Sequence, residues 1–467
     1  MDIYTNSTEE TDKNVKFIDL CFTDPLGSFH HMQYLAQNLD NKDHVAFDGS
    51  SIKLFEEINH SDLLLIFDKS TTIIDPMAKY PTLQVICDIE KDGGIEYTRD
   101  PRTIAKKAIE YMRSTGIADK TLFGAEPEFF LFDGISYRLD NGNIAFTVHD
   151  EEAPWTSDNI KSRFTNNYKS NYPIQKPMDT TSDIRAEMMI KMEMMNLQPE
   201  KHHHEVGVCQ VELGFVAQSL VKCADTIQRY KYIVKNVADK NNKVASFMAK
   251  IFHDDNGNGM HIHQSLWKEG KPLFYSDTNS LDINPKYKLS DIALYYIGGI
   301  MKHAGSLTAF CNPTTNSYKR LQPGFEAPVN IAYSCGNRSV AIRIPDYDNN
   351  EPCAKRMEYR TPDPMGNPYL VLAANLMAGL DGIINKIHPG SICEDDLYEA
   401  ENSEKYPKIP ESLDEALNCL ERDHDYLTVS NVFSKDFITK YINYKKDEIK
   451  ELRRYPHPAE FKLYGHI

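Results

Sequence analysis

The sequence has 467 residues, 41% of them hydrophobic, which is enough for a large core and for more than one domain. It contains 52 Lys and Arg against 68 Asp and Glu, a formal net charge of −16 at pH 7. This acidic balance argues against nucleic acid or an anionic membrane as the main partner. It does not argue against an anionic substrate, which responds to local charge.

The N-terminus is polar and acidic and lacks the apolar segment of a signal peptide. Residues 367–384 form a long apolar stretch, but Asn375 and Asp381 interrupt it, so a buried helix explains it better than a membrane span. The nine cysteines are scattered without a CxxC pair, which fits reduced thiols. We therefore expect a cytoplasmic protein with no membrane partner.

Residues 1–14 are expected to form a tail, residues 15–100 an N-terminal domain, and residues 101–467 a larger second domain. Short apolar runs at 63–67 and 83–89, separated by polar turns, are typical of strands in a small sheet. A helix is predicted over 104–114, with Asp100 or Thr103 as its N-cap and Gly116 after its end.

The second domain mixes strands and helices. A strand is predicted over 122–132, followed by a long irregular segment at 134–182 that is rich in Asn, Ser, Pro and Asp. Residues 312–328 contain three prolines and a glycine and are predicted to form an ordered loop. Helices are predicted over 182–195, 223–241, 290–311, 367–387, 413–422 and 434–453.

Side chains two positions apart on a strand point to the same face of a sheet. Four segments have polar side chains at this spacing within otherwise apolar or small-residue sequence: Glu126 and Glu128, Gln210 and Glu212, His261 and His263, Glu358 and Arg360. A sheet normally buries an apolar face, so the joint pattern indicates the floor of a cavity. For any single pair, a solvated strand edge is the alternative.

Several glutamates in one cavity would repel one another, and divalent cations are the simplest way to keep them ionised. Mostly oxygen ligands with one imidazole suit Mg²⁺ or Mn²⁺, and no thiolate is needed. The glutamates are Glu126, Glu128, Glu205, Glu212 and Glu358.

A group of arginines lies between positions 320 and 360. Surface salt bridges would explain each one alone. Beside metal-binding carboxylates, however, they would clamp phosphates and a substrate carboxylate by bidentate hydrogen bonds, as in phosphoryl transfer. The sequence contains neither a Walker A loop nor a kinase glycine-rich loop. The arginines are Arg320, Arg338, Arg343, Arg356 and Arg360.

Over residues 15–467 the sequence resembles the class I bacterial-type glutamine synthetases (glutamate–ammonia ligases). The motifs that carry the resemblance are Phe47-Asp-Gly-Ser-Ser, Gly124-Ala-Glu-Pro-Glu-Phe-Phe, His203-His-Glu-Val, Asn256-Gly-Asn-Gly-Met-His-Ile-His, Asn312-Pro-Thr-Thr-Asn-Ser-Tyr-Lys-Arg-Leu, Pro323-Gly-Phe-Glu-Ala-Pro, Asn337-Arg-Ser and Asn367-Pro-Tyr-Leu.

The resemblance implies an α+β fold. It has a small β-grasp-like N-terminal domain and a large catalytic domain with a curved antiparallel sheet flanked by helices. It also implies a homododecamer of two hexameric rings with active sites between subunits, in which residues 456–461 reach the opposite ring.

The implied activity is ATP-dependent synthesis of L-glutamine from L-glutamate and ammonia through γ-glutamyl phosphate, with release of ADP and phosphate. Two or three Mg²⁺ or Mn²⁺ ions per subunit are expected. The residues agree with this chemistry, because a carboxylate must be activated before ammonia can displace an oxygen from it. Ammonium must lose a proton in an acidic pocket, and a lid such as 323–328 must exclude water.

By motif, the resemblance assigns each residue a role. One cation would be held by Glu128, Glu205 and Glu212, and a second by Glu126, His261 and Glu358. The substrate glutamate would contact Asn256, Gly257, Arg320, Glu326 and Arg360. The nucleotide and its phosphates would contact His263, Ser265, Arg338, Arg343 and Arg356. Asp48, Glu326 and Arg338 would act in catalysis, with Asp48 binding ammonium and taking its proton and Glu326 closing over the site.

Some positions depart from the family pattern. Phe55 replaces a common tryptophan, Cys353 lies near a usually basic position, and residues 249–255 lack the usual paired prolines. These departures bear on the nucleotide contacts, not on the metal ligands. Tyr398 resembles a tyrosine that some members carry adenylylated, but the sequence after it differs, which favours an unmodified tyrosine.

In the histidine run, His202 is expected to face away, while His203 and His204 orient the Glu205 segment. Two rival functions remain. One is a γ-glutamyl ligase that uses another amine, although Asp48 and Glu326 favour ammonia. The other is a non-catalytic homologue, which should have lost metal or phosphate residues that are all present in this chain.

Overall fold

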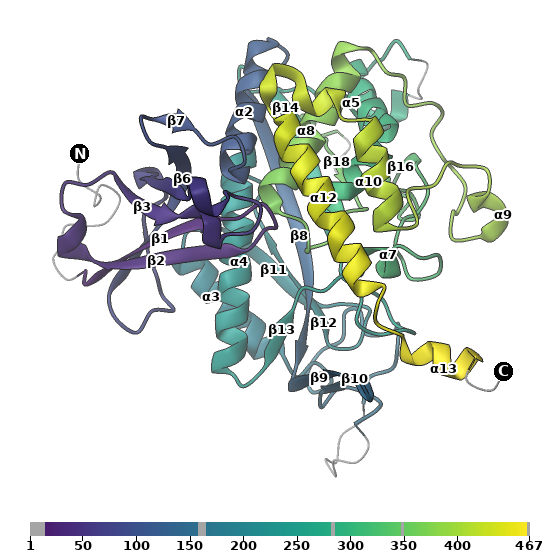
Figure 1. Cartoon of the computed structure of the whole chain (residues 1–467). Coiled ribbons are helices and arrows are strands. Elements are labelled where there is room, and N and C mark those ends of the chain that lie inside the picture. Colours follow the sequence, from purple (N-terminus) through teal and green to yellow (C-terminus); the bar gives the residue numbers. More distant parts are fainter. Residues whose placement is uncertain (1–14, 157–164, 282–284, 347–349, 465–467) are drawn as a thin grey trace.

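The computed structural model describes residues 15–156, 165–281, 285–346 and 350–464. An N-terminal sheet, purple in Figure 1, lies beside a larger body built on a second sheet and flanked by helices. No helix in the described ranges is long and apolar enough to cross a membrane.

The N-terminal sheet has the strand order β2-β1-β6-β4-β3, with β1 and β6 parallel and the other pairs antiparallel. The predicted strands at 63–67 and 83–89 are confirmed as β4 and β6. The sheet has its own apolar core, which includes Leu20, Leu65 and Val85. The bounds are β1 (Phe17–Thr23), β2 (Phe29–Leu35), β3 (His44–Asp48), β4 (Asp62–Phe67), β5 (Ile73–Ile74), β6 (Thr82–Lys91) and β7 (Ile95–Glu96).

The second sheet has the order β11-β12-β8-β14-β18-β17-β16, with β13 beside β8 and β15 beside β14. All its pairs are antiparallel except β16 with β17. The long strand β8 confirms the strand predicted over 122–132. The bounds are β8 (Lys120–Phe132), β11 (Pro199–His204), β12 (Gln210–Phe215), β13 (Val244–Ser246), β14 (Met260–Lys268), β15 (Lys271–Pro272), β16 (Tyr333–Cys335), β17 (Ile342–Ile344) and β18 (Met357–Tyr359).

Helices cover this sheet, and α8 is almost completely buried among α2, α4 and α5. It confirms that the apolar stretch at 367–387 is a core helix. Asp100 caps α2 by accepting hydrogen bonds from the Arg102 and Thr103 amides. The bounds of the longer helices are α2 (Pro101–Ser114), α3 (Ser182–Met194), α4 (Leu220–Lys240), α5 (Asp291–Lys302), α6 (Ala304–Cys311), α8 (Pro368–Ile384), α10 (Leu413–Arg422) and α12 (Lys435–Leu452). Shorter ones are α7 (Ser317–Arg320), α9 (Ala400–Ser403), α11 (Asp425–Thr428) and α13 (Pro458–Tyr464).

The single helix predicted over 290–311 is wrong. The segment forms α5 and α6, which meet at His303. The His303 ring lies between two carboxylates, with Nε2 2.9 Å from Asp381 and Nδ1 2.9 Å from Asp423. These contacts come from α8 and from the end of α10, so the break depends on residues distant in sequence.

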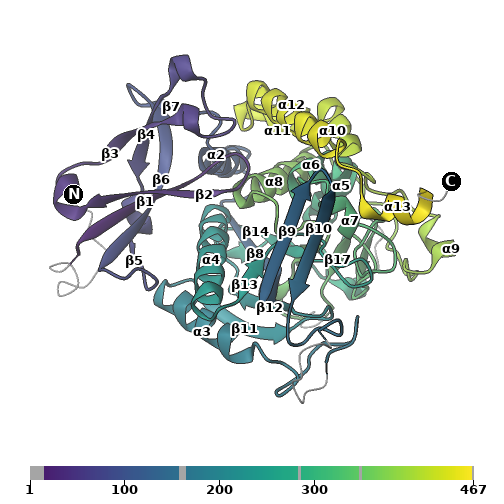
Figure 2. The ribbon, with the colours of Figure 1, turned by 60° about the horizontal axis from the view of Figure 1, so that its bottom comes forward.

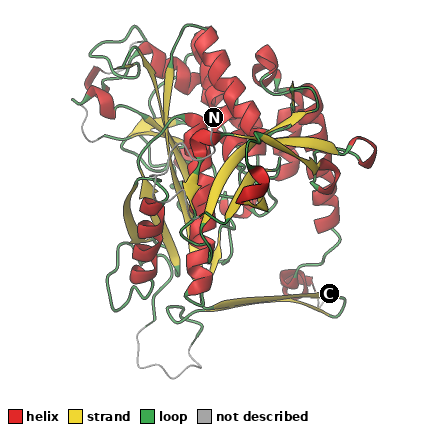
Figure 3. Cartoon of the chain, turned by 90° about the vertical axis from the view of Figure 1, so that its left-hand side faces the viewer, coloured by secondary structure: helices red, strands yellow, loops and turns green. Residues whose placement is uncertain are grey.

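The irregular segment predicted over 134–182 is also wrong in its first part. It contains a hairpin of β9 (Gly134–Asp140) and β10 (Asn143–His149), which lies in front in Figure 2 and projects from the lower edge of the body in Figures 1 and 3. In its register Tyr137 faces Phe146 and Leu139 faces Ile144, so these apolar residues share one face. Tyr137, Leu139 and Phe146 are exposed.

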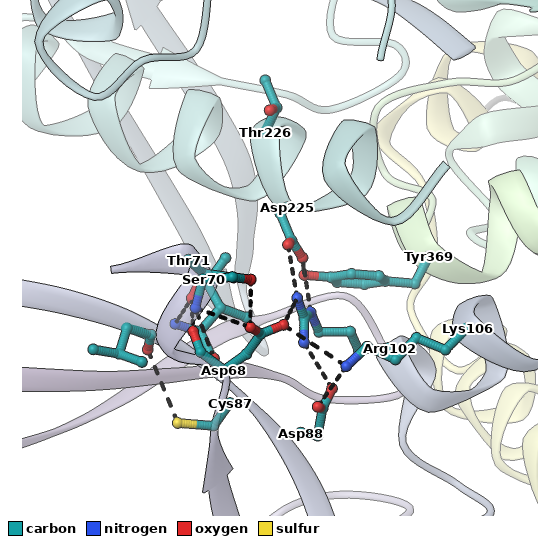
Figure 4. A network of polar contacts seen from close by, with 12 residues as sticks. Asp68, Ser70, Thr71, Cys87, Asp88, Arg102, Lys106, Asp225, Thr226 and Tyr369 are labelled. Carbon is teal, nitrogen blue, oxygen red and sulfur yellow. Dashed lines mark hydrogen bonds and ion pairs between the residues drawn. The ribbon is translucent and has the colours of Figure 1, made fainter. Parts of the chain in front are cut away.

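Arg102 of α2 ties the N-terminal sheet to the second domain (Figure 4). Its guanidinium contacts Asp68 at 2.8 Å and Asp88 at 2.7 Å, both of the N-terminal part, and Asp225 of α4 at 3.0 Å. Asp225 also accepts a hydrogen bond from Tyr369 Oη of α8 at 2.6 Å. This buried cation, together with Arg229 of α4, which donates to Gln84 Oε1 at 2.8 Å, therefore helps to fix how the two sheets sit relative to each other.

Candidate active site

Cross-strand registers bring the predicted polar residues together. Glu128 faces Glu212 across β8 and β12, and Glu126 faces His261 across β8 and β14. Glu358 of β18 faces His263 on one side and Arg343 on the other. Directly opposed residues of antiparallel strands have neighbouring side chains, so the sheet floor carries two adjacent acidic groups.

The first group contains Glu128, Glu205, Glu212 and His203. Ligand atoms of the last three lie within 4.8 Å of one another. His203 Nδ1 is 3.3 Å from Glu205 Oε1, and its Nε2 is 3.4 Å from Glu212 Oε1. Burial, together with repulsion from neighbouring carboxylates, raises the pKa of Glu128 and of Glu205 to about 8. These acids are crowded in a way that a divalent cation would relieve.

The second group contains Glu126, Glu358, His261 and His263. Ligand atoms of Glu126, His263 and Glu358 lie within 4.8 Å of one another. His261 Nδ1 is 3.4 Å from Glu126 Oε2 and 3.7 Å from Glu358 Oε1. Although burial opposes it, contact with His263 and His261 holds the pKa of Glu126 well below its usual range. Both imidazoles are therefore within reach of this group, whereas the family motif assigns His263 to the nucleotide.

Arginines surround Glu358. Arg360 Nη1 lies 2.5 Å from Glu358 Oε1, and Arg343 Nη1 lies 2.6 Å from Glu358 Oε2. Burial alone would raise the pKa of Glu358, but Arg360 and the two histidines outweigh it and lower the pKa to about 2. Arg356 Nε is 3.2 Å from His263 Nδ1.

Most of the predicted residues line one cavity of about 320 Å³. They are Glu126, Glu128, Glu205, Glu212, Asn256, Gly257, His261, Arg320, Glu326, Arg338 and Arg360. Two buried polar atoms of these residues, Asn256 Oδ1 and Arg360 Nε, have no hydrogen-bond partner among the described residues. An acceptor and a guanidinium donor thus remain available to a small zwitterionic ligand.

Hydrogen bonds to the side chain of Asp255 hold the loop that carries Asn256 and Gly257 in place. Asp255, fully buried, accepts hydrogen bonds from the amides of Val208 at 2.7 Å and Asn256 at 3.0 Å. A Cβ at Gly257 would lie 2.2 Å from the Ala249 carbonyl oxygen, so only glycine fits there.

Comparison with known protein families shows to which family the chain belongs. A sequence model of the glutamine synthetase catalytic domain matches residues 98–464, and one of the glutamine synthetase β-grasp domain matches residues 14–92. The chain belongs to the glutamine synthetase family. The α+β fold class expected from the sequence, with its β-grasp N-terminal domain and larger catalytic domain, is confirmed.

Individual relatives are similar to this chain over nearly its whole length. A glutamine synthetase of Azorhizobium caulinodans is 48% identical and is matched over 97% of this chain and 96% of that protein. A protein of Cupriavidus pinatubonensis named 3-hydroxylaminophenol mutase is 46% identical, with 97% of each chain covered. The solved structure of Plasmodium falciparum glutamine synthetase superposes with a TM-score of 0.89 at 32% identity, covering 98% of this chain and 97% of that one.

The loop at 323–328, called the flap below, borders the cavity. Glu326 lines the cavity and has a φ of +55°, a left-handed conformation that is uncommon for glutamate. Gly324, with a φ of +87°, suits the same turn. Phe325 also lines the cavity.

Asp48 does not line the cavity of its own chain. It lies at the end of β3, where its carboxylate accepts hydrogen bonds from Ser50 Oγ and Ser51 Oγ at 2.6 Å each. These hydrogen bonds lower the pKa of Asp48. Asp48 is exposed on the N-terminal sheet.

Two other predicted residues, Ser265 and Tyr398, lie outside the cavity lining. Ser265 Oγ accepts a hydrogen bond from Trp267 Nε1 at 3.0 Å and lies outside the cavity lining. Tyr398 is 38% exposed, and its Oη donates to the Arg338 carbonyl at 3.3 Å. The tyrosine is therefore accessible at the edge of the site.

In the histidine run, His202 lies away from the cavity and accepts a hydrogen bond from Arg185 Nε at 3.2 Å. His204 has Nδ1 2.7 Å from the Glu205 carbonyl and Nε2 3.0 Å from Glu152 Oε2, an arrangement suited to orienting the Glu205 segment. His203, by contrast, lines the cavity between Glu205 and Glu212.

Several cavity residues received no site role from the sequence: Tyr172, Lys201, Gln210 and Phe325. Gln210 carried a signal, its spacing of two from Glu212. Its Nε2 donates to Glu128 Oε2 at 2.8 Å.

Proposed function

We propose that this chain is an ATP-dependent glutamate–ammonia ligase. The γ-carboxylate of glutamate attacks the γ-phosphorus of ATP, giving γ-glutamyl phosphate and ADP. Ammonia then adds to the acyl carbon, the bond from that carbon to the phosphate oxygen breaks, and glutamine, phosphate and a proton are released. The observation that carries the proposal is one cavity in which two acidic groups meet buried arginines and an unpartnered amide oxygen.

The donor set fits divalent cations. Carboxylate oxygens with imidazole nitrogens suit Mg²⁺ or Mn²⁺, and the repulsion among Glu128, Glu205 and Glu212 needs a positive partner. Glu128, Glu205 and Glu212 would hold one cation, and Glu126, His261 and Glu358 a second, with two or three per subunit. When bound, the cations supply charge neutralisation between the phosphates and the attacking carboxylate.

The substrate glutamate would be bound by its α-groups. The unpartnered Asn256 Oδ1 would accept a hydrogen bond from the α-ammonium, and Gly257 lets the backbone approach closely. Arg360 Nε and the buried guanidinium of Arg320 would bind carboxylates. This orientation would direct the γ-carboxylate toward the acidic groups and the phosphates.

The transferred phosphate would be stabilised by arginines. Arg338 lines the cavity. Arg343 donates a hydrogen bond to Glu358, and Arg356 donates one to His263. His263 and Ser265 would contact the nucleotide. Guanidinium groups around the transferring phosphoryl group stabilise the charge that develops there.

Ammonium would be bound and deprotonated by Asp48 and Glu326. Glu326 lies on the flap at the cavity, so it can approach the acyl phosphate from outside. Asp48 is outside the cavity of its own chain, so it would serve the site of a neighbouring subunit. The carboxylate pair would attract NH₄⁺ and take its proton.

A homododecamer of two hexameric rings would complete these sites. The position of Asp48 supports it. The exposed apolar face of the β9–β10 hairpin, with Tyr137, Leu139 and Phe146, also needs a covering partner. The helix α13 extends away from the body near the C-terminus in Figure 1, as an arm that reaches another subunit would.

The decisive experiment is ATP turnover with glutamate and a panel of acceptors. Turnover with ammonium should exceed that with methylamine or putrescine. Faster turnover with an amine would reassign the chain as an amine-dependent γ-glutamyl ligase. The name of the Cupriavidus relative adds one more substrate to the panel, an arylhydroxylamine. Its rearrangement without ATP use, and no glutamine formation, would replace the ligase proposal.

Tyr398 is accessible beside Arg338, but the sequence that follows it favours an unmodified tyrosine over an adenylylated one. Intact-mass analysis of the native protein tests this. A species heavier by one adenylyl group and removed by phosphodiesterase would support modification.

A further inference from the structure

Two lysines outside the assigned site residues contact the flap. The ring centroid of Phe325, next to Glu326, lies 3.9 Å from Lys169 Nζ and 3.6 Å from Lys250 Nζ. An ammonium is attracted to the face of an aromatic ring within about 6 Å of its centroid, so both contacts are close ones.

The Phe325 ring helps to stabilise the buried ammonium of Lys250. The side chain is buried and forms no ion pair with any described carboxylate, and its ammonium donates to the Asp255 carbonyl oxygen. Burial lowers the pKa of Lys250 to about 8. A buried ammonium needs groups that replace its hydration, and Phe325 supplies one of them. The backbone of Lys250 is fixed by Asn316, whose side chain accepts from the Lys250 amide and donates to the Lys250 carbonyl, each at 2.8 Å.

Lys169 holds the same turn from another segment of the chain. Its Nζ donates to the Gly324 carbonyl oxygen at 3.0 Å, in addition to the ring contact. Its backbone amide donates to Asp255 Oδ1 at 3.1 Å. Asp255 also accepts from the Asn256 amide, so the lysine is anchored to the loop that borders the substrate cavity.

We propose that Lys169 and Lys250 are positioning residues that hold the flap closed through Phe325 while γ-glutamyl phosphate waits for ammonia. This inference rests on the proposed ligase function. With the flap open, water would add to the acyl carbon in place of ammonia. The carbon–oxygen bond to phosphate would break, glutamate and phosphate would be released, and one ATP would be spent without making glutamine.

The quantity that reports the flap is therefore the number of ATP molecules consumed per glutamine formed. A lysine with a purely structural role would change stability or the total rate, but not this ratio. The ratio for the unaltered protein should be close to one. Two cation–π contacts of ordinary strength shift the equilibrium between the closed and the open flap by roughly tenfold. Losing both should therefore raise the share of ATP that is consumed without glutamine formation about tenfold.

The variants are Lys169→Met, Lys250→Met and the double variant, assayed at saturating glutamate and ammonium with ADP and glutamine measured together. Lys250→Arg should restore coupling because a guanidinium also binds an aromatic face. Lys231→Met is the matched control. That ammonium also donates to a backbone carbonyl, of Pro364 at 2.5 Å, and lies 5.7 Å from the Phe247 ring, and it does not line the cavity. Its ratio should stay at one.

Phe325 gives an independent test from the flap side. Phe325→Tyr should keep the ratio near one, and Phe325→Leu should raise it as the double lysine variant does. The inference is overturned if the double lysine variant and Phe325→Leu both make glutamine at the ratio of the unaltered protein. An unaltered protein that makes no glutamine at all would instead overturn the ligase function on which the inference rests.

Discussion

Replacing Glu128 by Gln should stabilise the metal-free protein while removing a ligand for the cation. Burial and the neighbouring Glu212 raise the pKa of Glu128 from its ordinary value of 4.5 to about 8. A carboxyl whose folded-state pKa lies above its unfolded value loses stability as pH rises between the two values. At pH 7 the loss amounts to about 3 kcal/mol, because pH 7 lies about 2.5 units above the unfolded value and each unit corresponds to about 1.4 kcal/mol. A glutamine avoids that loss because its amide cannot ionise.

The glutamine can also keep the local hydrogen bonds. Glu128 Oε2 accepts from Gln210 Nε2 at 2.8 Å and from the Gly259 amide at 2.7 Å, and an amide oxygen can accept both. The geometry should therefore survive the substitution. The gain then measures the free energy of protonating Glu128 on folding.

The assay is urea unfolding in EDTA at pH 5, 7 and 8.5. The advantage of Glu128→Gln over the unaltered protein should be small at pH 5, about 3 kcal/mol at pH 7 and larger at pH 8.5. Glu404→Gln, at an exposed carboxylate with no described partner, is the control and should change little. With Mg²⁺ present the order should reverse, because only the unaltered protein gains full binding energy. A Glu128→Gln protein that is less stable at pH 7 in EDTA would refute the reasoning.

Three further predictions concern the domain contact, the flap and the shared site. Arg102→Met should lower the free energy of unfolding by about 3–5 kcal/mol, because the buried Asp225 loses its ion pair, whereas Asp68 and Asp88 keep Lys106. Arg454→Met, at an exposed pair, should lose under about 1 kcal/mol, and equal losses in urea unfolding would contradict this. Glu326→Ala should keep ADP and Mn²⁺ binding by calorimetry but lose most glutamine synthesis, so unchanged turnover would rule out its role. Co-assembly of inactive Asp48→Asn and Arg338→Ala chains should restore about a quarter of the activity, since random pairing leaves that share of sites intact; no recovery would place both residues in one chain.

The sequence predicted the floor of the site because its signal is local. The spacing of Glu126 from Glu128 and of His261 from His263 follows from the alternation of β8 and β14, and both strands exist. The pairing of these strands was not in the sequence pattern itself. It became expected only through the family resemblance.

What the sequence did not predict depends on contacts between distant segments. The break at His303 depends on Asp381 and Asp423, far along the chain. Likewise, Lys169 belongs to a segment predicted to be irregular, and only the folded chain places its ammonium over Phe325.

The β9–β10 hairpin was missed for a different reason. Its apolar residues alternate with polar ones, among them Arg138 and Asn143, inside a stretch rich in turn-forming residues. Composition favoured a loop, whereas the alternation of Ile135, Tyr137 and Leu139 favoured a strand. The exposed apolar face shows that the alternation was the better guide.

The most direct measurement is glutamine formation from ¹⁵N-ammonium, glutamate and ATP, followed by NMR with Mg²⁺ or Mn²⁺ and again in excess EDTA. If acids from separate strands bring cations and phosphates to one glutamate, labelled glutamine and ADP should appear in equal amounts, and only with a divalent cation. Labelled glutamine at the same rate in EDTA, or ATP consumption without labelled product in either metal, would contradict the account.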